Sequence, residues 1–359
     1  MKQKRRTVAK LNASMVSEAL KQELFFPFFQ PIMDSESGLC IGAEVLARLV
    51  MPDGQEFCPA DFLPALSTDK LQLLLTHIIL RKLAVLLPAL SLPHQFMLAL
   101  NIPANLLGQE SLVRACSTLI SAGRVPVNLV LEITEHTPLT LTDSQVKSGV
   151  ESLRQAGIRL ALDDFGTGHS GLAVLRRLPF DILKIPAEFT CPGDKDSLSS
   201  KLLDNILHLA SLCNLSIIAE GVENAKQSYD LSAKGLRLQQ GYYLSPPLSG
   251  EHFSCYTNRK LCLCHPYAGF PRHVYNAPGE VGLSGSLLRK CARKHLLSHR
   301  EEEVMALTVR GYSLSEIAAQ FRRSTKTLST QKRSIYRKLG VRNDTTFIHY
   351  LYRMRDEQA

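Results

Sequence analysis

Short apolar runs alternate with stretches of helical periodicity from about residue 25 to residue 250, and this alternation restricts the fold more than any other feature. The helical stretches, such as residues 69–87 and 202–213, repeat apolar residues at spacings of three and four. The runs of strand length are GLCIGAEVL (38–46), FMLALNI (96–102), NLVLEIT (128–134), IRLALDDF (158–165), DILKI (181–185), LSIIAEGV (215–222) and GYYLS (241–245). Strand-helix repetition over this length predicts a parallel sheet covered by helices.

Polar residues recur where these runs end. They are Glu44, Asn101, Glu132, Asp163, Asp164, Lys184 and Glu220, with Gln240 just before the last run. In a closed (β/α) barrel the carboxyl ends of all strands meet at one face, which is where such enzymes place the active site. An open doubly wound sheet would scatter these side chains along an edge, and no glycine-rich dinucleotide fingerprint follows a strand. We therefore expect an α/β barrel, with the open sheet as the alternative.

The stretch ALDDFGTGHSG (161–171) places two adjacent aspartates at the end of a buried segment. Adjacent carboxylates repel each other and are costly to desolvate, so they need cations, hydrogen-bond donors or water nearby. A solvated turn that caps a helix would meet this need, and so would a metal site. With the acids and the amide at the other strand ends, the aspartates form an oxygen-rich cage suited to Mg²⁺ or Mn²⁺. Two such ions are a standard device for cleaving a phosphodiester.

Two basic residues accompany the acids. Lys184 would place a fixed positive charge near the attacking water or the phosphate, or would simply close an ion pair among the acids. Arg48 offers a planar guanidinium that can grip a phosphate through two hydrogen bonds. Gly166 and Gly168 let the loop after the aspartates turn sharply.

Composition limits the class of protein. A chain of 359 residues, 45% of them hydrophobic, accommodates one large soluble domain and a small one. No stretch approaches the roughly 20 uninterrupted apolar residues of a membrane span. No secretory apolar segment follows the basic start MKQKRRTVAK, so we expect a cytoplasmic protein without a membrane partner. Nine cysteines at irregular spacing indicate reduced thiols.

Residues 251–290 are rich in Pro, Gly and turn-forming residues, which predicts a linker or a loosely packed extension. The segment contains Cys255, Cys262, Cys264 and His265. Cys-x-Cys-His is not one of the usual spacings of structural zinc, and no second ligand pair follows, so we do not expect a zinc site.

The positive charge of the chain is concentrated near its C-terminus. Residues 1–286 contain 26 Lys and Arg against 26 Asp and Glu, whereas residues 287–359 contain 16 against 7. Neutralising phosphates is the commonest use of a compact basic module, although a solvated basic face without a ligand would show the same excess.

Short motifs also occur in a fixed order over residues 20–250. The sequence Glu44-Val45-Leu46 is followed by Arg48. Around it lie FFQPI (28–32), LNIPANLL (100–107), LEITE (131–135), LDDFGTGHSGL (162–172), LKI (183–185), AEGVE (219–223) and QQGYYLSPPL (239–248). This set resembles the EAL domain, the bacterial phosphodiesterase that hydrolyses cyclic di-guanylate (cyclic di-GMP) to a linear dinucleotide.

The resemblance implies a (β/α)₈ barrel with an irregular first strand, a two-metal Mg²⁺ or Mn²⁺ site, and a role for each matched residue. Lys184 and Glu220 would assist the nucleophilic water. Gln240 would close the site, and Arg48 would bind the substrate phosphate. The metal ligands implied are Glu44, Asn101, Glu132, Asp163 and Asp164.

Two further glutamates match the family motifs at a distance from the metals. Glu135 would brace the loop after the paired aspartates, a loop that couples dimerisation to activity in this family. Glu223 fits a supporting shell around the site.

The chain departs from the family pattern at a few positions. Val45 replaces Ala with a modest change of volume, and His169 and Gly171 replace Tyr and Ser in the loop. Pro186 stands where the family usually has Asp directly after Lys-Ile, so a carboxylate and a backbone donor are both missing beside Lys184. If that Asp only supports geometry, activity survives at a reduced rate. If it orders a metal, the domain binds nucleotide without cutting it.

The basic C-terminal part has the layout of a helix-turn-helix. A Ser precedes the acidic turn Glu301-Glu302-Glu303, Gly311 breaks the first helix, and Ser313 caps the next one, SLSEIAAQF. The stretch STKTLSTQKRSIYRKLGV (324–341) predicts a third helix with Leu328, Ile335 and Leu339 on its inner face. A short helix, a tight turn and a basic helix are typical of a DNA reader whose recognition helix comes second.

These residues resemble the LuxR-type DNA-binding domain over about residues 294–352. The matching elements lie at 297–301, 316–318, 326–327 and 338–341. We expect Lys326, Ser329, Thr330 and Arg333 at the major groove, and Arg322, Arg323, Lys332 and Arg337 at phosphates. Domains of both families tend to dimerise, so we expect a homodimer on double-stranded promoter DNA.

We therefore expect a basic tail at 1–19, an EAL domain at 20–250, a linker at 251–290 and a helix-turn-helix domain at 291–359. One hypothesis is a transcription regulator that hydrolyses cyclic di-GMP and binds DNA. The alternative makes the barrel a catalytically impaired sensor or a dimerisation scaffold.

Overall fold

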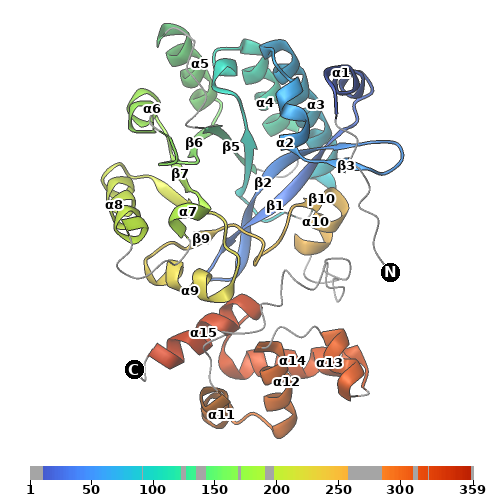
Figure 1. Cartoon of the computed structure of the whole chain (residues 1–359), viewed down its shortest axis with the longest axis vertical. Coiled ribbons are helices and arrows are strands. Elements are labelled where there is room, and N and C mark those ends of the chain that lie inside the picture. Colours follow the sequence, from blue (N-terminus) through green and yellow to red (C-terminus); the bar gives the residue numbers. More distant parts are fainter. Residues whose placement is uncertain are drawn as a thin grey trace.

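A computed structural model describes residues 11–90, 92–122, 127–134, 143–168, 171–190, 198–257, 285–309, 314–321 and 323–356 (Figure 1). The strands are β1 (Phe25–Asp34), β2 (Leu39–Val50), β3 (Glu56–Phe57), β4 (Phe96–Asn101), β5 (Val127–Thr134), β6 (Arg159–Asp163), β7 (Ile182–Ile185), β8 (Ser216–Ala219), β9 (Leu238–Gln239) and β10 (Leu248–Ser249). The helices up to residue 257 are α1 (Ala13–Lys21), α2 (Pro59–Phe62), α3 (Asp69–Leu86), α4 (Glu110–Ala122), α5 (Asp143–Gln155), α6 (Gly171–Arg177), α7 (Ala187–Thr190), α8 (Leu198–Leu212), α9 (Ala225–Ala233) and α10 (Gly250–Thr257). The C-terminal helices are α11 (Gly285–Lys294), α12 (His299–Val309), α13 (Leu314–Phe321), α14 (Thr325–Leu339) and α15 (Asp344–Asp356).

The sheet closes on itself. Its order is β10-β1-β9-β8-β7-β6-β5-β4-β2-β3, and the additional β1–β2 pairing joins the two halves into an eight-stranded barrel. Strand β1 runs antiparallel to β2 and β9, while the pairs from β2–β4 to β8–β9 are parallel. The predicted barrel with an irregular first strand is confirmed, and the open sheet is excluded.

The last barrel strand differs from the sequence prediction. The apolar run GYYLS (241–245) does not form a strand, because β9 covers only Leu238 and Gln239 and the chain then turns. Strand β1 was not among the predicted runs, although it lies in the barrel wall. Its sequence, FFPFFQPIMD, contains two prolines. Because proline is unusual inside a strand, the sequence did not predict a strand of ten residues here.

The interior of the barrel explains the polar strand ends. A layer of apolar residues packs together inside it: Ile32, Met97, Ala99, Val130, Ala161, Ile182 and Ile218. Side chains alternate between the two faces of a strand, so the residue two positions further along also points inward. For Ala99, Val130, Ala161, Ile182 and Ile218 those next residues are Asn101, Glu132, Asp163, Lys184 and Glu220. The polar layer therefore lies directly on an apolar floor at the carboxyl end of the barrel.

Helices at both ends of the barrel domain lie outside its expected bounds. Val16, Ala19 and Leu20 of α1 are buried in the barrel core, so the expected boundary at residue 20 falls inside this helix. Phe253 of α10 is fully buried and stacks on Phe29 at a centroid distance of 4.7 Å. The barrel thus continues into the segment expected to be a linker.

Helix α3 is the most apolar of the covering helices. By length and composition alone, Asp69–Ala89 is long and apolar enough to cross a membrane. Charged residues such as Lys70 and Arg81 interrupt its apolar sequence, so it contains no uninterrupted apolar run of that length. In the structure its residues Leu75, Ile78 and Leu83 are buried in the barrel core. Their burial accounts for the apolar character of this helix.

The C-terminal helices form a second domain with its own core. Buried residues from all five helices α11 to α15 meet there, among them Leu288, Met305, Ile317, Leu328 and Leu351. The predicted start of α12 is confirmed as a capping box, in which Ser298 N donates to Glu301 Oε2 at 2.8 Å and Glu301 N donates to Ser298 Oγ at 3.3 Å. Gly311 and Ser313 lie outside the described residues.

Glu301 also links α12 to α14, and this contact leads to a stability prediction. Lys338 Nζ donates to Glu301 Oε2 at 2.7 Å. Burial by itself raises the pKa of Glu301, but the hydrogen bonds from Lys338 and Ser298 outweigh it and lower the pKa to about 2. We expect Glu301→Gln to lower the free energy of unfolding of the helical domain by about 1.5–3 kcal/mol at pH 7, the usual value of hydrogen bonds to a charged group.

The pH dependence of this effect follows from the direction of the pKa shift. The folded pKa lies below the unfolded value of about 4.5, so the unfolded chain binds more protons between the two. The stabilisation by Glu301 is therefore complete above about pH 4.5 and is lost as pH falls toward 2. Calorimetry of the full chain at pH 7 and pH 3 should show a smaller difference between wild type and variant at the lower pH. A constant difference would contradict the assignment.

Candidate functional site

Lys184 lies at the centre of the polar layer and is 1% exposed. Its ammonium Nζ lies 2.7 Å from Glu220 Oε1, 2.9 Å from Glu132 Oε2, 3.1 Å from Asp163 Oδ1 and 3.3 Å from Glu44 Oε2. Four carboxylates from four neighbouring parts of the barrel wall thus surround one cation. Glu44 lies in the middle of β2, because this strand continues to Val50, beyond the predicted end of the run at residue 46. The sequence prediction that these residues converge on one face of the barrel holds for all of them.

Glu44 joins the acidic cluster to two amides. Asn101 Nδ2 donates to Glu44 Oε1 at 2.6 Å, and Gln240 Nε2 donates to Glu44 Oε2 at 2.6 Å. Asn101 pairs with Glu132 across β4 and β5 in the same register. The two amides reach Glu44 from either side of β2, since β4 pairs with β2 directly and β9 follows β1 on the other side in the closed barrel.

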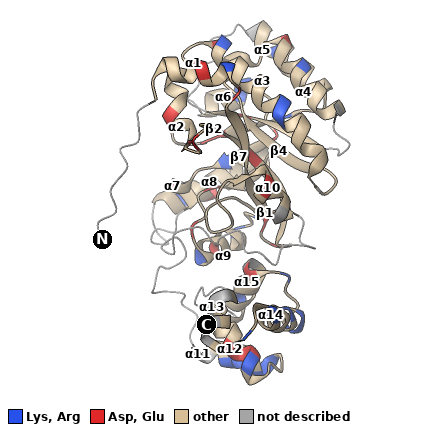
Figure 2. Cartoon of the chain, turned by 90° about the vertical axis from the view of Figure 1, so that its right-hand side faces the viewer, with Lys and Arg blue, Asp and Glu red and all other residues tan. Residues whose placement is uncertain are grey.

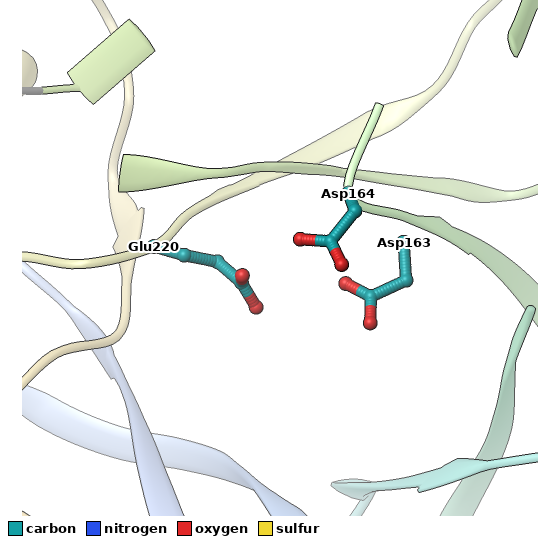
Figure 3. A group of neighbouring side chains, drawn as sticks. All are labelled: Asp163, Asp164 and Glu220. Atoms are coloured by element: carbon teal, nitrogen blue, oxygen red, sulfur yellow. The ribbon is translucent and has the colours of Figure 1, made fainter. Parts of the chain in front are cut away.

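The paired aspartates both face Glu220, as Figure 3 shows. One carboxylate oxygen of each of Asp163, Asp164 and Glu220 lies within 4.8 Å of the other two. Successive residues of a strand normally point to opposite faces. Here Asp164 adopts φ +55°, in the left-handed region, and so turns its side chain back beside that of Asp163. A non-glycine residue in this region is strained, and such strain is concentrated at functional sites. Gly166, with φ +93°, completes the turn.

The charges of the cluster shift one another's pKa values. Burial raises the pKa of Glu132 well above its usual value, and the neighbouring acids add to the effect although Lys184 opposes it. Burial, again opposed by Lys184, raises the pKa of Glu220 to about 7. For Glu44, burial acts upward, but Lys184 and the two amides outweigh it and lower the pKa. Burial would lower the pKa of Lys184, but the surrounding carboxylates raise it well above its usual value. The lysine is therefore held as a cation.

Some carboxylate and amide oxygens of the cluster accept no hydrogen bond from the part of the chain that the structure describes. Glu132 Oε1 and Gln240 Oε1 are buried without a hydrogen-bond partner among them, and so is Asp163 Oδ1, although the Lys184 ammonium is near it. Unpaired buried oxygens are costly. Hard divalent cations take several carboxylate and amide oxygens as ligands, so the donor set fits Mg²⁺ or Mn²⁺.

Some predicted residues lie apart from this cluster. Arg48 lies four residues beyond Glu44 on β2, where its Nη1 donates to Ala47 O at 3.0 Å and its guanidinium lies 5.8 Å from the centre of the Phe28 ring. The side chain of Glu223 is exposed. Glu135 and His169 lie outside the described residues, as do Cys262, Cys264 and His265.

Thr190 and Gln227 support the site and were not predicted. Thr190 Oγ1 donates to the carbonyl of Glu220 at 2.6 Å. Gln227, which is buried, donates to the carbonyls of Gly221 and Thr190 and accepts from the backbone N of Glu223 at 2.8 Å. The two side chains fix the loop after β8. Neither has a sequence signal, because each acts through backbone atoms of another segment.

Pro186 is buried directly after β7, two residues beyond Lys184. Its carbonyl accepts from Phe189 N at 3.1 Å and so starts the short helix α7. Its ring has no backbone N–H to donate. The four carboxylates reach Lys184 with the proline in place.

The second candidate site is helix α14. Its predicted DNA-contacting residues Lys326, Thr330, Arg333 and Arg337 are exposed. Ser329 is buried, and Arg333 Nη2 donates to its Oγ at 3.3 Å. Basic residues mark this helix in Figure 2.

Lys332, predicted to contact phosphate, is held within the domain. Its Nζ lies 2.6 Å from Asp344 Oδ1 at the start of α15, and only 14% of its side chain is exposed. The Tyr336 hydroxyl donates to the same carboxylate. Arg323 lies over the Phe321 ring, and Arg322 lies outside the described residues.

The barrel, its acidic cluster and the helical domain define the class of protein. The sequence profile of the EAL domain matches residues 13–247, so the chain belongs to the EAL domain family. The profile described as "Bacterial regulatory proteins, luxR family" matches residues 295–351, and the chain therefore also carries a LuxR-family DNA-binding domain.

Particular relatives agree with this assignment. The chain is 34% identical over 241 residues to the cyclic di-GMP phosphodiesterase PdeL of Escherichia coli strain K12, covering 66% of each chain. It is 35% identical over 238 residues to the probable cyclic di-GMP phosphodiesterase PdeG of the same strain, covering 66% of this chain and 47% of PdeG. The matches thus span about half to two thirds of these relatives. Among solved structures, the FimX EAL domain of Pseudomonas aeruginosa bound to c-di-GMP is similar with a TM-score of 0.57 and 26% identity, covering 66% of this chain and 97% of that one.

Proposed function

We propose that the barrel is a metal-dependent phosphodiesterase that hydrolyses cyclic di-GMP to linear pGpG, coupled to DNA binding by the C-terminal domain. The observation that carries the proposal is the arrangement of four carboxylates around Lys184, beside which Glu132 Oε1 and Gln240 Oε1 are buried without a hydrogen-bond partner among the described residues. The names of the relatives support the choice of substrate.

Glu44, Asn101, Glu132, Asp163 and Asp164 would hold Mg²⁺ or Mn²⁺. The metals would supply Lewis-acid polarisation of the phosphate and a nucleophile at neutral pH. Asn101 and Gln240 keep Glu44 oriented for this task through their hydrogen bonds.

The chain's own residues then act on water and phosphate. The attacking water oxygen forms a bond to phosphorus as one bridging P–O bond of the ring breaks, and the leaving ribose oxygen takes up a proton. Glu220, 2.7 Å from Lys184, is placed to accept the proton of the water. The Lys184 ammonium stabilises the negative charge that develops on the phosphate. Arg48 would bind the other phosphate from the rim of the barrel.

The test is incubation of the purified full chain with cyclic di-GMP and Mg²⁺ or Mn²⁺, with linear product followed by chromatography. We expect product from the wild type and none from Glu44→Ala. Glu56→Gln, at an exposed glutamate of β3, is the matched control and should keep wild-type activity. Saturable nucleotide binding without product would favour the alternative, a sensor or scaffold.

The variant Pro186→Asp also distinguishes an active phosphodiesterase from a catalytically impaired sensor. All four carboxylates that contact Lys184 are in place beside the proline, so we expect the new carboxylate to raise turnover by less than about tenfold. The measurement is the steady-state rate with saturating metal. Pro186→Ala is the control, since it removes the ring without adding a charge. A larger gain for Pro186→Asp alone would show that the native barrel is a sensor.

The helical domain would make this enzyme a cytoplasmic transcription regulator that binds promoter DNA as a homodimer. The exposed residues Lys326, Thr330 and Arg333 would read bases, and Arg337 would contact phosphate. Light scattering of the purified chain tests the dimer, and the salt dependence of DNA affinity tests the phosphate contacts.

A further inference from the structure

The DNA-binding domain contacts the barrel through α15. This helix lies beside α9 in Figure 1, and Ala225 and Tyr229 of α9 pack against the core of the helical domain. At the other end of the contact, Asn343 Nδ2 donates to the carbonyl of Gly38 at 2.5 Å. Gly38 has φ +64°, and a Cβ there would collide with Asn343. The two domains are therefore closely fitted at the turn between β1 and β2.

His349 of α15 contacts helix α9 of the barrel domain. Its Nε2 lies 2.9 Å from Ser228 Oγ, and its ring meets the Tyr229 ring edge-on at 6.0 Å. Burial lowers the pKa of His349 to about 4, so the ring is neutral near pH 7. One of its two ring nitrogens then donates and the other accepts.

The directions of the hydrogen bonds follow from the fully buried amide of Gln239. Its Nε2 donates to the carbonyls of Ser228 at 3.0 Å and Leu236 at 2.9 Å. Its Oε1 therefore faces Ser228 Oγ at 2.6 Å, and Ser228 must donate to it. Because the serine proton is used in this way, the bond between His349 and Ser228 requires a proton on His349 Nε2. The chain of donors runs in one direction, from the DNA-binding domain into the barrel.

Gln239 is adjacent to Gln240, whose side chain donates to Glu44 in the acidic site. The backbone of Gln240 is held on both sides, since its N donates to Ala219 O at 2.8 Å and its O accepts from Val222 N at 3.1 Å. A displacement of Gln239 would move the backbone that carries Gln240. Three residues, Ser228, Gln239 and Gln240, and three side-chain hydrogen bonds thus connect His349 to Glu44.

We propose that His349 is a positioning residue for the acidic site: by donating to Ser228 it holds Gln239, and with it Gln240, against Glu44. Docking of the DNA-binding domain and occupancy of the acidic site are then linked, and each favours the other by the same factor. The identity of the ligand as cyclic di-GMP rests on the proposed function, whereas the positioning itself does not.

Hydrogen exchange in the full chain tests the positioning without any nucleotide. We expect His349→Ala to speed the exchange of the amides of residues 239–243, and His349→Gln, whose side-chain amide can donate to Ser228, to restore it. His295→Ala is the matched control, because His295 bonds to Lys338 O and to the Tyr350 hydroxyl within the helical domain. Unchanged exchange in His349→Ala, or equally fast exchange in His349→Gln, would overturn the proposal.

Kinetics with cyclic di-GMP tests the link to the site. We expect His349→Ala to lower kcat/KM by roughly 5- to 20-fold, a typical coupling between sites, with His349→Gln and His295→Ala near wild type. A wild type without hydrolysis or binding would refute the proposed function, and the exchange experiment would still decide the role of His349. Equal kcat/KM in wild type and His349→Ala would overturn the link.

Discussion

Replacing Lys184 by methionine is expected to lower the melting temperature of the full chain, in the absence of added metal, by about 6–20 °C. Lys184 is the cation shared by Glu44, Glu132, Asp163 and Glu220 in a buried layer. Removing one partner of a buried ion pair costs about 3–5 kcal/mol, since the remaining charges are left uncompensated. For a domain of this size each kcal/mol corresponds to about 2–4 °C. Hydrolysis should be lost as well, because the Lys184 ammonium would no longer stabilise the negative charge that develops on the attacked phosphate.

The same variant reports on the metal. A divalent cation bound by these carboxylates supplies the positive charge that methionine lacks, so Mg²⁺ or Mn²⁺ should raise the melting temperature of Lys184→Met more than that of the wild type. Calorimetry with and without metal measures both effects. Lys234→Met is the control, because Lys234 pairs with Asp204 at the surface and such pairs contribute about 0–1 kcal/mol. A Lys184→Met protein that melts within 2 °C of the wild type would contradict the role assigned to this lysine.

The location of the acidic site was predictable from the sequence because two simple rules combine. Parallel strands bring their carboxyl ends to one face, and the two-residue period of a strand points Ala161 and Asp163, or Ile182 and Lys184, to the same side. These rules need no knowledge of distant contacts. They therefore placed the acids, Asn101 and Lys184 at one barrel mouth, while the family motifs suggested their roles and added Gln240.

The other features of the site and the fold could not be predicted, because they depend on contacts between segments that are far apart in the sequence. The sequence places Asp163 and Asp164 at the end of a buried segment, but the left-handed φ that turns Asp164 beside Asp163 is set by the whole loop. GYYLS has a strand-like composition and yet forms a turn, because β9 ends at Gln239 and the chain turns over residues 241–244. Helix α15, which carries His349 to the barrel, had no assigned role because its partner Ser228 lies 121 residues away in the chain.

In the DNA-binding domain, the environment of Lys332 likewise depends on a residue of another helix and could not be predicted from the sequence. Lys332 precedes Arg333 by one position on α14, and the sequence predicts a DNA contact for both residues, to a phosphate for Lys332 and to a base for Arg333. In the structure Asp344 of α15 holds Lys332, whereas Arg333 is exposed and makes its hydrogen bond to Ser329. A lysine already paired with a carboxylate releases few counterions when DNA binds. The two residues should therefore differ in function.

Arg333→Ala is expected to weaken binding to a duplex selected from a random library by about 1–3 kcal/mol, or roughly 5- to 150-fold, the usual value of a base contact. Lys332→Met should leave the affinity for DNA within about twofold of the wild type and should not change the slope of log affinity against log salt concentration. It should lower the free energy of unfolding of the helical domain by up to about 1 kcal/mol. Fluorescence anisotropy over a series of salt concentrations measures affinity and slope, and calorimetry measures stability. If Lys332→Met instead reduced the slope by about one, Lys332 would contact a phosphate, as its position in the sequence predicts, and would have to leave Asp344 to do so.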